Sequence, residues 1–551
     1  MNVQLCSIRI ETLGCRLNQA EAESFAAMCI DEGFSIYTGH TDYTGYRSAE
    51  HTGANDSVLY YNPKTPDNAH TLPTDTASAE TTNTSIVTAV EAAAPIQLSS
   101  TLPPEQTVLC FVNTCTVTGK AEQKARRLIR LLVKIHPHAV ILVTGCYAQL
   151  ESTEIEALHP HILAFPGQQK DLLTEIPSYL AELVRGSAYF DTAFFLSAVR
   201  AYLTDLTNSI PQNTPIQNTS IQNLSERSIL GIRKKRLFAL SSPHFLFHSR
   251  ALLKIQDGCN DACAYCRIRL ARGKSVSLPA SEVLERLRCI EETGAREVTL
   301  TGVNLSQYRS EAGDFADMLK LILENTEMRI RISSLYPDRI DEALVPLLAH
   351  PQICPHFHLS IQSGSNAVLK AMHRGYRKAT VYQAASELRR VKDNPFIGAD
   401  IIAGFPGETE EDFEETYRMC RELNFAGIHA FPFSARPGTE AWKMQPKVPE
   451  RIAGQRVKKL NELAETQSAA YLQAWDGKLI CGVVEAPRNG QQTVITENYL
   501  SLPLTSDSLQ EYRLYGGEYV HIRVQGKNAV LTDITSRPQA LLMNRNLPST
   551  N

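Results

Sequence analysis

The chain has 551 residues, with 55 Lys and Arg against 59 Asp and Glu, so its formal net charge is −4. This length predicts about three to four domains. The near balance of charge gives no overall basic character, so a nucleic-acid site must be a local patch.

Neither a signal peptide nor a membrane span is predicted. Residues 1–10 lack the apolar stretch of a signal peptide, and no later run is long and uncharged enough to cross a bilayer. We therefore expect a cytoplasmic protein that makes no membrane contact. The 13 cysteines, an odd number, favour reduced thiols and metal ligation over a disulfide framework.

Residues 1–195 are predicted to form an open α/β domain. Runs at 108–113 and 139–144 have strand length, and residues 120–135 between them show helical periodicity, which indicates a β-α-β unit. Residues 38–105, rich in Thr, Ser, Ala, Asn and Pro, bury too little apolar surface to offset ordering entropy, so we expect a low-complexity insertion. Residues 196–245 are predicted to be an interdomain linker.

Three cysteines of this domain follow strands at equivalent places. Cys15 follows the N-terminal strand, and Cys115 and Cys146 follow the two strands of the β-α-β unit. Because the carboxyl ends of parallel strands meet at one edge of a sheet, three thiolates there can hold one iron-sulfur cluster. The alternative, an ordinary buried thiol, suits three cysteines inside apolar runs: Cys6, Cys29 and Cys110.

A second set of cysteines, Cys259, Cys263 and Cys266, has C-x3-C-x2-C spacing. Three thiolates so spaced can bind one iron-sulfur cluster and leave its fourth iron without a protein ligand. A structural zinc site is the competing interpretation, but zinc usually takes four ligands in two separated pairs, and no fourth Cys or His lies nearby in the sequence. The spacing resembles that of the radical S-adenosylmethionine (SAM) enzymes, whose open iron chelates SAM and which generate a 5′-deoxyadenosyl radical.

Residues 246–470 are predicted to form a partial (β/α)6 barrel and residues 471–540 a small all-β barrel. Six strand-like runs support the first: 252–255, 297–303, 329–335, 357–362, 397–404 and 427–433. The first run leads into the cysteine loop, which places that loop at the carboxyl-end mouth of the barrel. Short alternating strands follow a charged helix over 449–475, and they predict the second barrel.

Four motifs carry a closer resemblance, which runs in order along nearly the whole chain and omits only the two low-complexity stretches. They are TLGCRLNQAE at 12–21, NTCTVT at 113–118, VTGCYAQ at 143–149 and KIQDGCN at 254–260. Together they resemble the methylthiotransferase family of radical SAM enzymes, and most closely its branch that modifies N6-threonylcarbamoyladenosine in tRNA. The resemblance implies that the protein adds a methylthio group to C2 of that base at position 37, using two SAM molecules.

The resemblance implies three domains, two 4Fe-4S clusters and SAM. An auxiliary cluster would be held by Cys15, Cys115 and Cys146, and the catalytic radical SAM cluster by Cys259, Cys263 and Cys266. The SAM-binding positions that it implies are Gly302, Ser363, Gly364 and Glu408. The C-terminal domain would be a tRNA-binding TRAM domain.

The implied partners are the anticodon loop of tRNA and a reducing electron donor, and the sequence does not indicate an oligomeric state. One candidate tRNA surface is the basic helix 120–134, because phosphates bind Lys and Arg without sequence readout. Further candidates lie in the C-terminal barrel: Tyr499, Tyr512, Arg513, Tyr515 and Arg523.

Other functions stay open. Sister branches of the family act on isopentenyladenosine in tRNA or on an aspartate of a ribosomal protein, and a non-catalytic iron-sulfur RNA-binding protein is the alternative outside enzymes. The TLGCRLN and NTCTVT runs favour the threonylcarbamoyl branch. Two places depart from the family pattern: Arg267-Ile-Arg269 replaces apolar residues and Pro, and Leu335-Tyr336 stands where Glu is usual. We expect these departures to affect SAM and substrate contacts and to leave the clusters intact.

Overall fold

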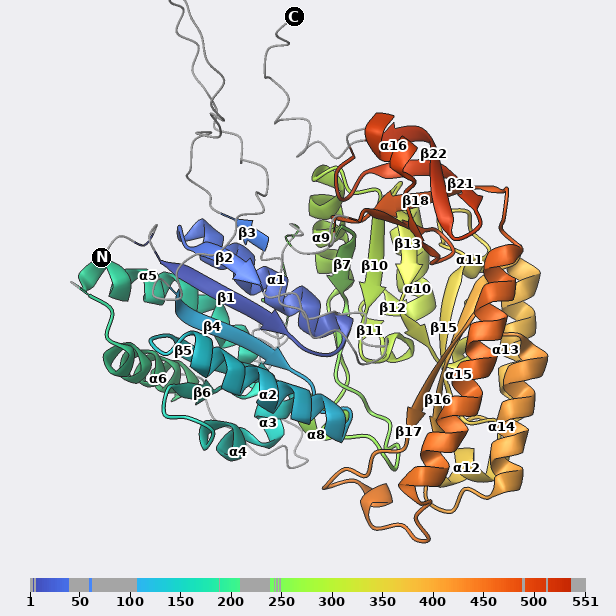
Figure 1. Cartoon of the computed structure of the whole chain (residues 1–551), viewed down its shortest axis with the longest axis horizontal. Helices are drawn as coiled ribbons and strands as arrows, with labels where there is room; N and C mark the ends of the chain where they lie inside the picture. The colour runs from blue at the N-terminus through green and yellow to red at the C-terminus, as the bar shows by residue number, and fades with distance from the viewer. Residues whose placement is uncertain are drawn as a thin grey trace, which may run out of the picture.

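The computed structural model describes residues 3, 6–38, 59–61, 107–187, 189–208, 238–241, 243, 246, 249–487, 491–511 and 514–536. An N-terminal α/β unit lies beside a central partial barrel, and a C-terminal antiparallel sheet, red in Figure 1, packs at one end of that barrel. The predicted fold class is confirmed. No helix among these residues is both long and apolar enough to span a membrane.

The N-terminal unit is built on a six-stranded sheet of order β3-β2-β1-β4-β5-β6. All pairs are parallel except β2 with β3. Its strands are β1 (Ser7–Thr12), β2 (Ser35–Thr38), β3 (Leu59–Tyr61), β4 (Thr107–Thr114), β5 (Val140–Gly145) and β6 (Ile162–Ala164). Its helices are α1 (Arg16–Asp31), α2 (Gly119–Ile135), α3 (Cys146–Leu150), α4 (Ser152–Glu156), η3 (Gly167–Glu175), α5 (Ile176–Gly186) and α6 (Thr192–Asn208). The predicted β-α-β unit is therefore β4-α2-β5.

The structure differs from the predicted segments at two places. Strand β3, inside the expected insertion 38–105, pairs with β2, and the rest of that insertion beyond Thr38 lies outside the described residues. Helix α6 runs 13 residues into the expected linker 196–245. Its residues Phe195, Val199 and Leu203 recur every four positions and are buried in the N-terminal core, so that unit continues to Asn208.

The central unit has six consecutive parallel strands, as predicted. They are β7 (Ala251–Lys254), β10 (Glu297–Thr301), β13 with β14 (Arg329–Ile332 and Ser334–Leu335), β15 (His356–Gln362), β16 (Phe396–Ala403) and β17 (Gly427–Pro432). The third strand is interrupted at Ser333, which divides the barrel wall into two sheets. The outer helices are α9 (Ala280–Glu292), α10 (Phe315–Asn325), α11 (Val345–Leu348), α12 (Asn366–Ala371), α13 (Lys378–Val391), α14 (Glu410–Leu423) and α15 (Glu450–Gln473).

The C-terminal unit is a five-stranded antiparallel sheet of order β20-β19-β18-β21-β22. Its elements are β18 (Leu479–Val484), β19 (Thr493–Thr496), β20 (Ser501–Pro503), α16 (Ser506–Glu511), β21 (Tyr519–Gln525) and β22 (Asn528–Ser536). Buried Arg331 of the barrel donates to the carbonyls of Thr496 and Glu497 at 3.2 and 3.1 Å, which docks this sheet onto the barrel. The sheet is a partly closed barrel consistent with a TRAM-like domain.

Candidate active site

The structure brings together the first predicted cysteine triad. Cys15, Cys115 and Cys146 follow β1, β4 and β5, and β4 is hydrogen-bonded in parallel to both of the other strands. Cys115 and Cys146 are buried, whereas Cys15 is exposed. Burial, together with the neighbouring Cys146 and Cys15, raises the pKa of the Cys115 thiol to about 12. The three thiols thus lie close enough to influence one another.

Two residues of the first motif hold this triad in place. Gly14 has a φ of 113°, and a Cβ there would lie 2.5 Å from the Cβ of Cys115, so only glycine lets the Cys15 loop approach this closely. The buried Asn18 donates through Nδ2 to the carbonyls of Leu13 and Thr114 at 2.9 and 3.1 Å. Asn18 therefore ties the Cys15 loop to the Cys115 loop.

The second triad lies in the loop after the short strand β8 (Gln256–Asp257). Each sulfur accepts a hydrogen bond: Cys259 from Gln307 Nε2 at 3.7 Å, Cys263 from Arg374 Nη1 at 3.4 Å, and Cys266 from the Ile268 N–H at 3.4 Å. Donors aimed at sulfur stabilise thiolates and tune the cluster that they bind. Burial, with Cys263 and Cys259 nearby, raises the pKa of the Cys266 thiol to about 12 in the absence of such a cluster.

The spacing of the sulfurs argues against a single metal ion in either triad. Among the described residues, neither cysteine triad brings its three ligand atoms within 4.8 Å of one another. One zinc ion would hold its thiolates at about 2.3 Å from itself and so close together. A 4Fe-4S cluster spaces them more widely, because each thiolate binds a different iron. The donor chemistry of both triads fits such a cluster.

One contact links the two triads across the interface between the N-terminal unit and the barrel. Helix α8 (Ile268–Arg272) begins two residues after Cys266 and ends at Arg272. Arg272 Nε donates to Cys146 Sγ at 3.2 Å, and its Nη2 donates to Asn18 Oδ1 at 2.6 Å. Six residues of mostly helical chain span only about 9 Å. The helix after one triad therefore contacts the other.

A buried network of charges surrounds this contact. Glu21 of α1, which is 0% exposed, pairs with Lys170 Nζ at 2.5 Å, Lys254 Nζ at 2.9 Å and Arg272 Nη1 at 3.5 Å. Arg272 also donates to both oxygens of Asp257, at 2.9 and 3.0 Å. Burial alone would raise the pKa of Glu21, but these cations hold it well below its usual value. The network joins two domains beside the auxiliary triad.

Arg267, which belongs to the first departure from the family pattern, contributes contacts to the same domain interface. Buried Arg267 donates to Glu122 Oε1 at 3.1 Å and to Glu151 Oε1 at 2.6 Å, both in the N-terminal unit. Arg436 of the barrel donates to the same Glu122 carboxylate. Two guanidinium groups thus hold one carboxylate next to the Cys115 loop. Arg267 therefore contacts the N-terminal unit. Neither of these two hydrogen bonds involves a predicted SAM-binding residue.

The second departure, Tyr336, lies at the radical SAM triad. The Arg374 guanidinium stacks 4.2 Å from the Tyr336 ring centre and donates to the Ser360 carbonyl at 2.6 Å, in addition to its bond to Cys263. Burial raises the pKa of Tyr336, with Arg374 opposing and Cys263 adding to that shift. Sequence reasoning missed Arg374, because it lies 111 positions from the cysteine it contacts.

The predicted SAM-binding residues lie at the mouth of the barrel, with internal partners. Gly302 follows β10, where a Cβ would lie 2.9 Å from Gln256 Oε1. Ser363 is fully buried and its hydroxyl lies 3.1 Å from Thr416 Oγ1, and Gly364 packs against the same residue. Glu408 accepts from the Gly404 N–H at 2.8 Å and from Arg456 at 2.6 Å. As SAM contacts, all four stay predictions.

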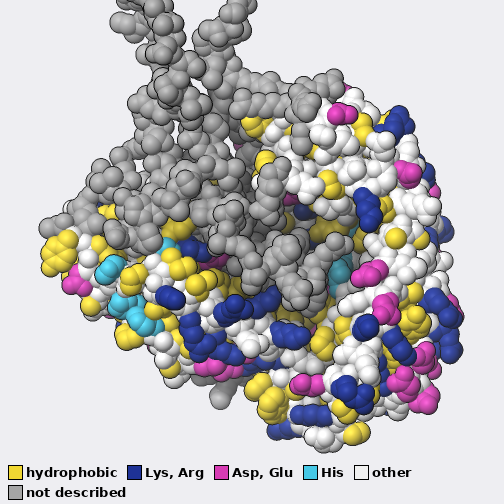
Figure 2. All heavy atoms as spheres, in the orientation of Figure 1, with side chains coloured by type: hydrophobic (Ala, Val, Ile, Leu, Met, Phe, Trp, Pro, Cys, Tyr) yellow, Lys and Arg dark blue, Asp and Glu magenta, His cyan; other side chains and the backbone are white. Residues whose placement is uncertain are grey.

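The candidate tRNA surfaces differ in exposure. Helix α2 presents an exposed basic face, and Lys and Arg side chains gather over it in Figure 2. Its members are Lys120, Lys124, Arg127, Arg130 and Lys134. Tyr499 is instead a domain contact, since its hydroxyl accepts from Arg16 Nη2 at 2.7 Å and its ring lies near Arg331. Tyr515 is half-buried and Arg523 exposed, whereas Tyr512 and Arg513 lie outside the described residues.

Comparison with known proteins decides the family. A family described as "Radical SAM superfamily" matches residues 253–420, and "Uncharacterized protein family UPF0004" matches residues 82–167. "Threonylcarbamoyladenosine tRNA methylthiotransferase MtaB" of Treponema pallidum (strain Nichols) is 46% identical over 95% of this chain and 99% of that protein. The chain belongs to the radical SAM methylthiotransferase family.

Two other relatives of this methylthiotransferase are more distant. The MtaB of Aquifex aeolicus (strain VF5) is 32% identical over 71% of this chain and 86% of its own. The "tRNA-2-methylthio-N(6)-dimethylallyladenosine synthase" of Syntrophotalea carbinolica (strain DSM 2380 / NBRC 103641 / GraBd1) is 32% identical over 71% and 84%. This methylthiotransferase is an enzyme that uses iron-sulfur clusters and SAM. As ligands of those clusters, the two cysteine triads stay predictions.

Replacing Arg374 with Met is expected to change the radical SAM cluster of this methylthiotransferase without removing it. The substitution takes a donor and a positive charge away from Cys263, so the reduced cluster loses stabilisation and its potential falls by on the order of tens of millivolts. A redox titration followed by electron paramagnetic resonance measures this shift. The control is Arg390→Met, an exposed residue paired with Glu387. Equal potentials in the two variants would refute a role for Arg374.

Proposed function

We propose that this protein adds a methylthio group to C2 of N6-threonylcarbamoyladenosine at position 37 of tRNA. The observation that carries the proposal is the contact of Arg272 with Cys146, which sets the two cysteine triads on either side of one domain interface. A sulfur-carrying cluster and a radical-generating cluster must both reach the same base. The 46% identity to the Treponema pallidum MtaB over nearly the full length supports the threonylcarbamoyl base as the substrate.

The residues of the chain position groups whose chemistry belongs to the cofactors. When bound, the clusters and SAM supply the methylthio sulfur and a radical that removes hydrogen from the adenine. Arg272 and Arg374 each donate to a cluster thiolate, and Asn18 fixes the loops of the auxiliary triad. SAM is proposed to bind beside Gly302, Ser363, Gly364 and Glu408. A reducing electron donor is proposed as the second partner.

The exposed basic face of α2 is proposed to bind the tRNA backbone. Phosphate contacts by Lys and Arg give affinity and register without reading sequence. The helix starts four residues after Cys115, so a tRNA held there brings its anticodon loop toward the auxiliary triad. A base in such a loop can be splayed out and stacked in an enzyme pocket at a lower cost in unpairing and unstacking than a paired base. We propose that this reaction takes place in the cytoplasm.

Mass spectrometry of tRNA nucleosides tests the proposed function. A strain lacking the gene should contain N6-threonylcarbamoyladenosine without its 2-methylthio form, and the wild-type gene should restore that form. Loss of the methylthio form of isopentenyladenosine would instead assign the chain to the sister branch. Loss from a ribosomal-protein aspartate would assign it to the third branch, and unchanged nucleosides and aspartate would favour a non-catalytic RNA-binding protein.

A further inference from the structure

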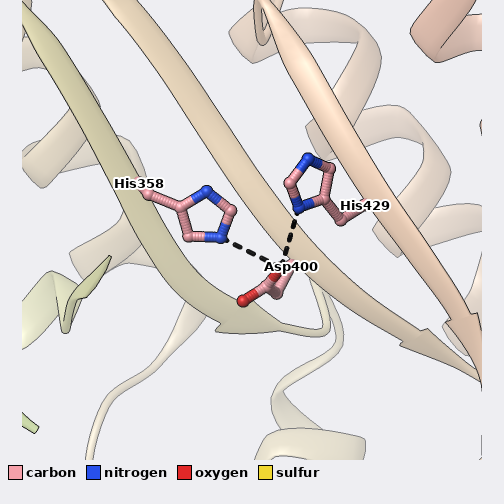
Figure 3. A group of neighbouring side chains, drawn as sticks. All are labelled: His358, Asp400 and His429. Carbon is pink, nitrogen blue, oxygen red and sulfur yellow. Dashed lines mark ion pairs between the residues drawn. The ribbon is translucent and has the colours of Figure 1, made fainter. Parts of the chain in front are cut away.

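Three side chains on neighbouring strands of the barrel form a compact group outside the cysteine site. His358 of β15, Asp400 of β16 and His429 of β17 point toward one another (Figure 3). His358 Nε2 lies 2.9 Å and His429 Nδ1 3.4 Å from Asp400 Oδ1. Among the described residues, this is the only set of three or more metal-binding side chains whose ligand atoms all lie within 4.8 Å of one another.

The strand ladder places these residues together. Asp400 is paired directly with His429, and His358 is paired with Gly398, two residues before Asp400. Their sequence neighbours Leu359 and Ile401 are fully buried in the core beneath the helices, so strand alternation turns the group to the other face of the sheet. Three hydrogen-bonded strands thus hold the group without any loop.

Gly398 makes room for the group. A Cβ at that position would lie 3.0 Å from His358 Nδ1, which is tighter than side chains normally approach. The absence of a side chain opposite His358 lets the imidazole lie against the strand with its Nε2 directed at Asp400. The site is therefore built into the backbone of β16 as well as into its three ligands.

The distances match the ligand shell of one metal ion. Zinc binds imidazole nitrogen and carboxylate oxygen at about 2.0–2.2 Å, so two adjacent ligands lie about 2.8–3.1 Å apart in octahedral and about 3.3–3.6 Å apart in tetrahedral arrangement. The two measured separations from Asp400 fall within these two ranges. Two imidazoles and one carboxylate are a donor set that binds zinc or ferrous iron and leaves coordination positions open.

Exposure also suits a cation. The side chains of His358 and Asp400 are 15% and 24% exposed, and that of His429 is 55% exposed. The group is therefore partly buried on the side of His358 and Asp400 and exposed to solvent on the side of His429, where water or an oxygen ligand can complete the coordination shell of the metal ion.

We propose that His358, Asp400 and His429 bind one divalent transition metal ion, of the zinc or ferrous class, separate from both iron-sulfur clusters. The site is distinct from the cysteine triads in position and donors. Strand β15 connects this group to the radical SAM triad. The carbonyl of Ser360, in the same strand as His358, accepts a hydrogen bond from Arg374, and Arg374 also donates to Cys263. A metal ion there lies on the same barrel as the radical chemistry without sharing a ligand with it.

Zinc content tests this site in the intact, cluster-loaded protein. Anaerobically reconstituted enzyme is incubated with zinc sulfate, passed through a desalting column and analysed for zinc and iron by inductively coupled plasma mass spectrometry. The wild type should retain about one zinc per chain beside an unchanged iron content. Asp400→Asn and His429→Gln should both lower zinc to background at the same iron content. His429 is the more exposed position, so its variant is the one expected to fold without difficulty.

A matched control distinguishes zinc binding at this site from nonspecific zinc binding by a histidine. His521 and Asp533 form another His–Asp pair, 3.9 Å apart in the C-terminal sheet, and the described residues supply no third ligand to it. His521→Gln should retain the wild-type zinc content. A wild type without zinc, or Asp400→Asn and His429→Gln variants that keep it, would overturn the proposal and leave the group as a hydrogen-bonded His–Asp–His cluster. Zinc uptake with matching iron loss would mean displacement at the cysteines and would also overturn it.

Discussion

Cys115→Ala enzyme is expected to lose methylthio transfer to tRNA while still cleaving SAM to methionine and 5′-deoxyadenosine. Cys115 lies in the proposed auxiliary triad, after the ends of β1, β4 and β5. We propose that SAM cleavage depends instead on the loop of Cys259, Cys263 and Cys266. Cys263→Ala should stop both reactions. Chromatography of SAM products and mass spectrometry of tRNA nucleosides, from the same reduced reaction, measure the two activities.

Iron analysis accompanies this experiment. The reconstituted parent should hold about eight irons, four for each cluster, and the variant with all three of Cys259, Cys263 and Cys266 changed to Ala about four. An iron content in that triple variant equal to the parent's would contradict the assignment of the cysteines.

The control is Cys110→Ala, five residues before Cys115 and within strand β4. Cys110 is fully buried in an apolar cluster, and burial raises the pKa of its thiol far above the usual value, so it remains a neutral core thiol. Its loss should affect packing modestly and chemistry little. The separation of roles is wrong if Cys110→Ala behaves like Cys115→Ala in both assays.

Glu21→Gln is expected to lower the free energy of unfolding by about 3–5 kcal/mol, because it leaves buried cations without their carboxylate. Lys170, Lys254 and Arg272 all contact Glu21, and they come from both sides of the domain interface. The variant should therefore unfold at a lower urea concentration and lose auxiliary-cluster iron before radical SAM iron. Urea titration with fluorescence and iron release as readouts measures both.

The pH dependence of this stabilisation has a defined sign. Because the cations hold the folded-state pKa of Glu21 below its usual 4.5, the stabilisation is fully present above that pH and declines as the pH falls below it. The difference between wild type and Glu21→Gln should shrink accordingly in acid. The control is Glu462→Gln, which breaks an exposed pair with Lys458 and should leave the urea midpoint nearly unchanged. A Glu21→Gln midpoint equal to that control would contradict the structural role of the network.

Local patterns in the sequence determined most of the fold and both cysteine triads. Strand length and apolar periodicity predicted β4-α2-β5 and the six barrel strands, because each pattern is complete within a few residues. The three cysteines of the barrel loop lie within eight residues, so their spacing alone indicates a shared cluster. Placement after parallel strands was enough to unite Cys15, Cys115 and Cys146, since strand ends of one sheet share an edge.

Tertiary structure alone decided what surrounds the triads. Arg272 meets Cys146 across 126 positions, and Arg374 meets Cys263 across 111. Glu21 and Lys254 stand inside the recognised motifs, yet their ion pair needs two domains to dock. No periodicity or spacing encodes such pairs, because their free energy arises only when folding removes both partners from water. The same holds for His358, Asp400 and His429, which become one group only through the register of three strands.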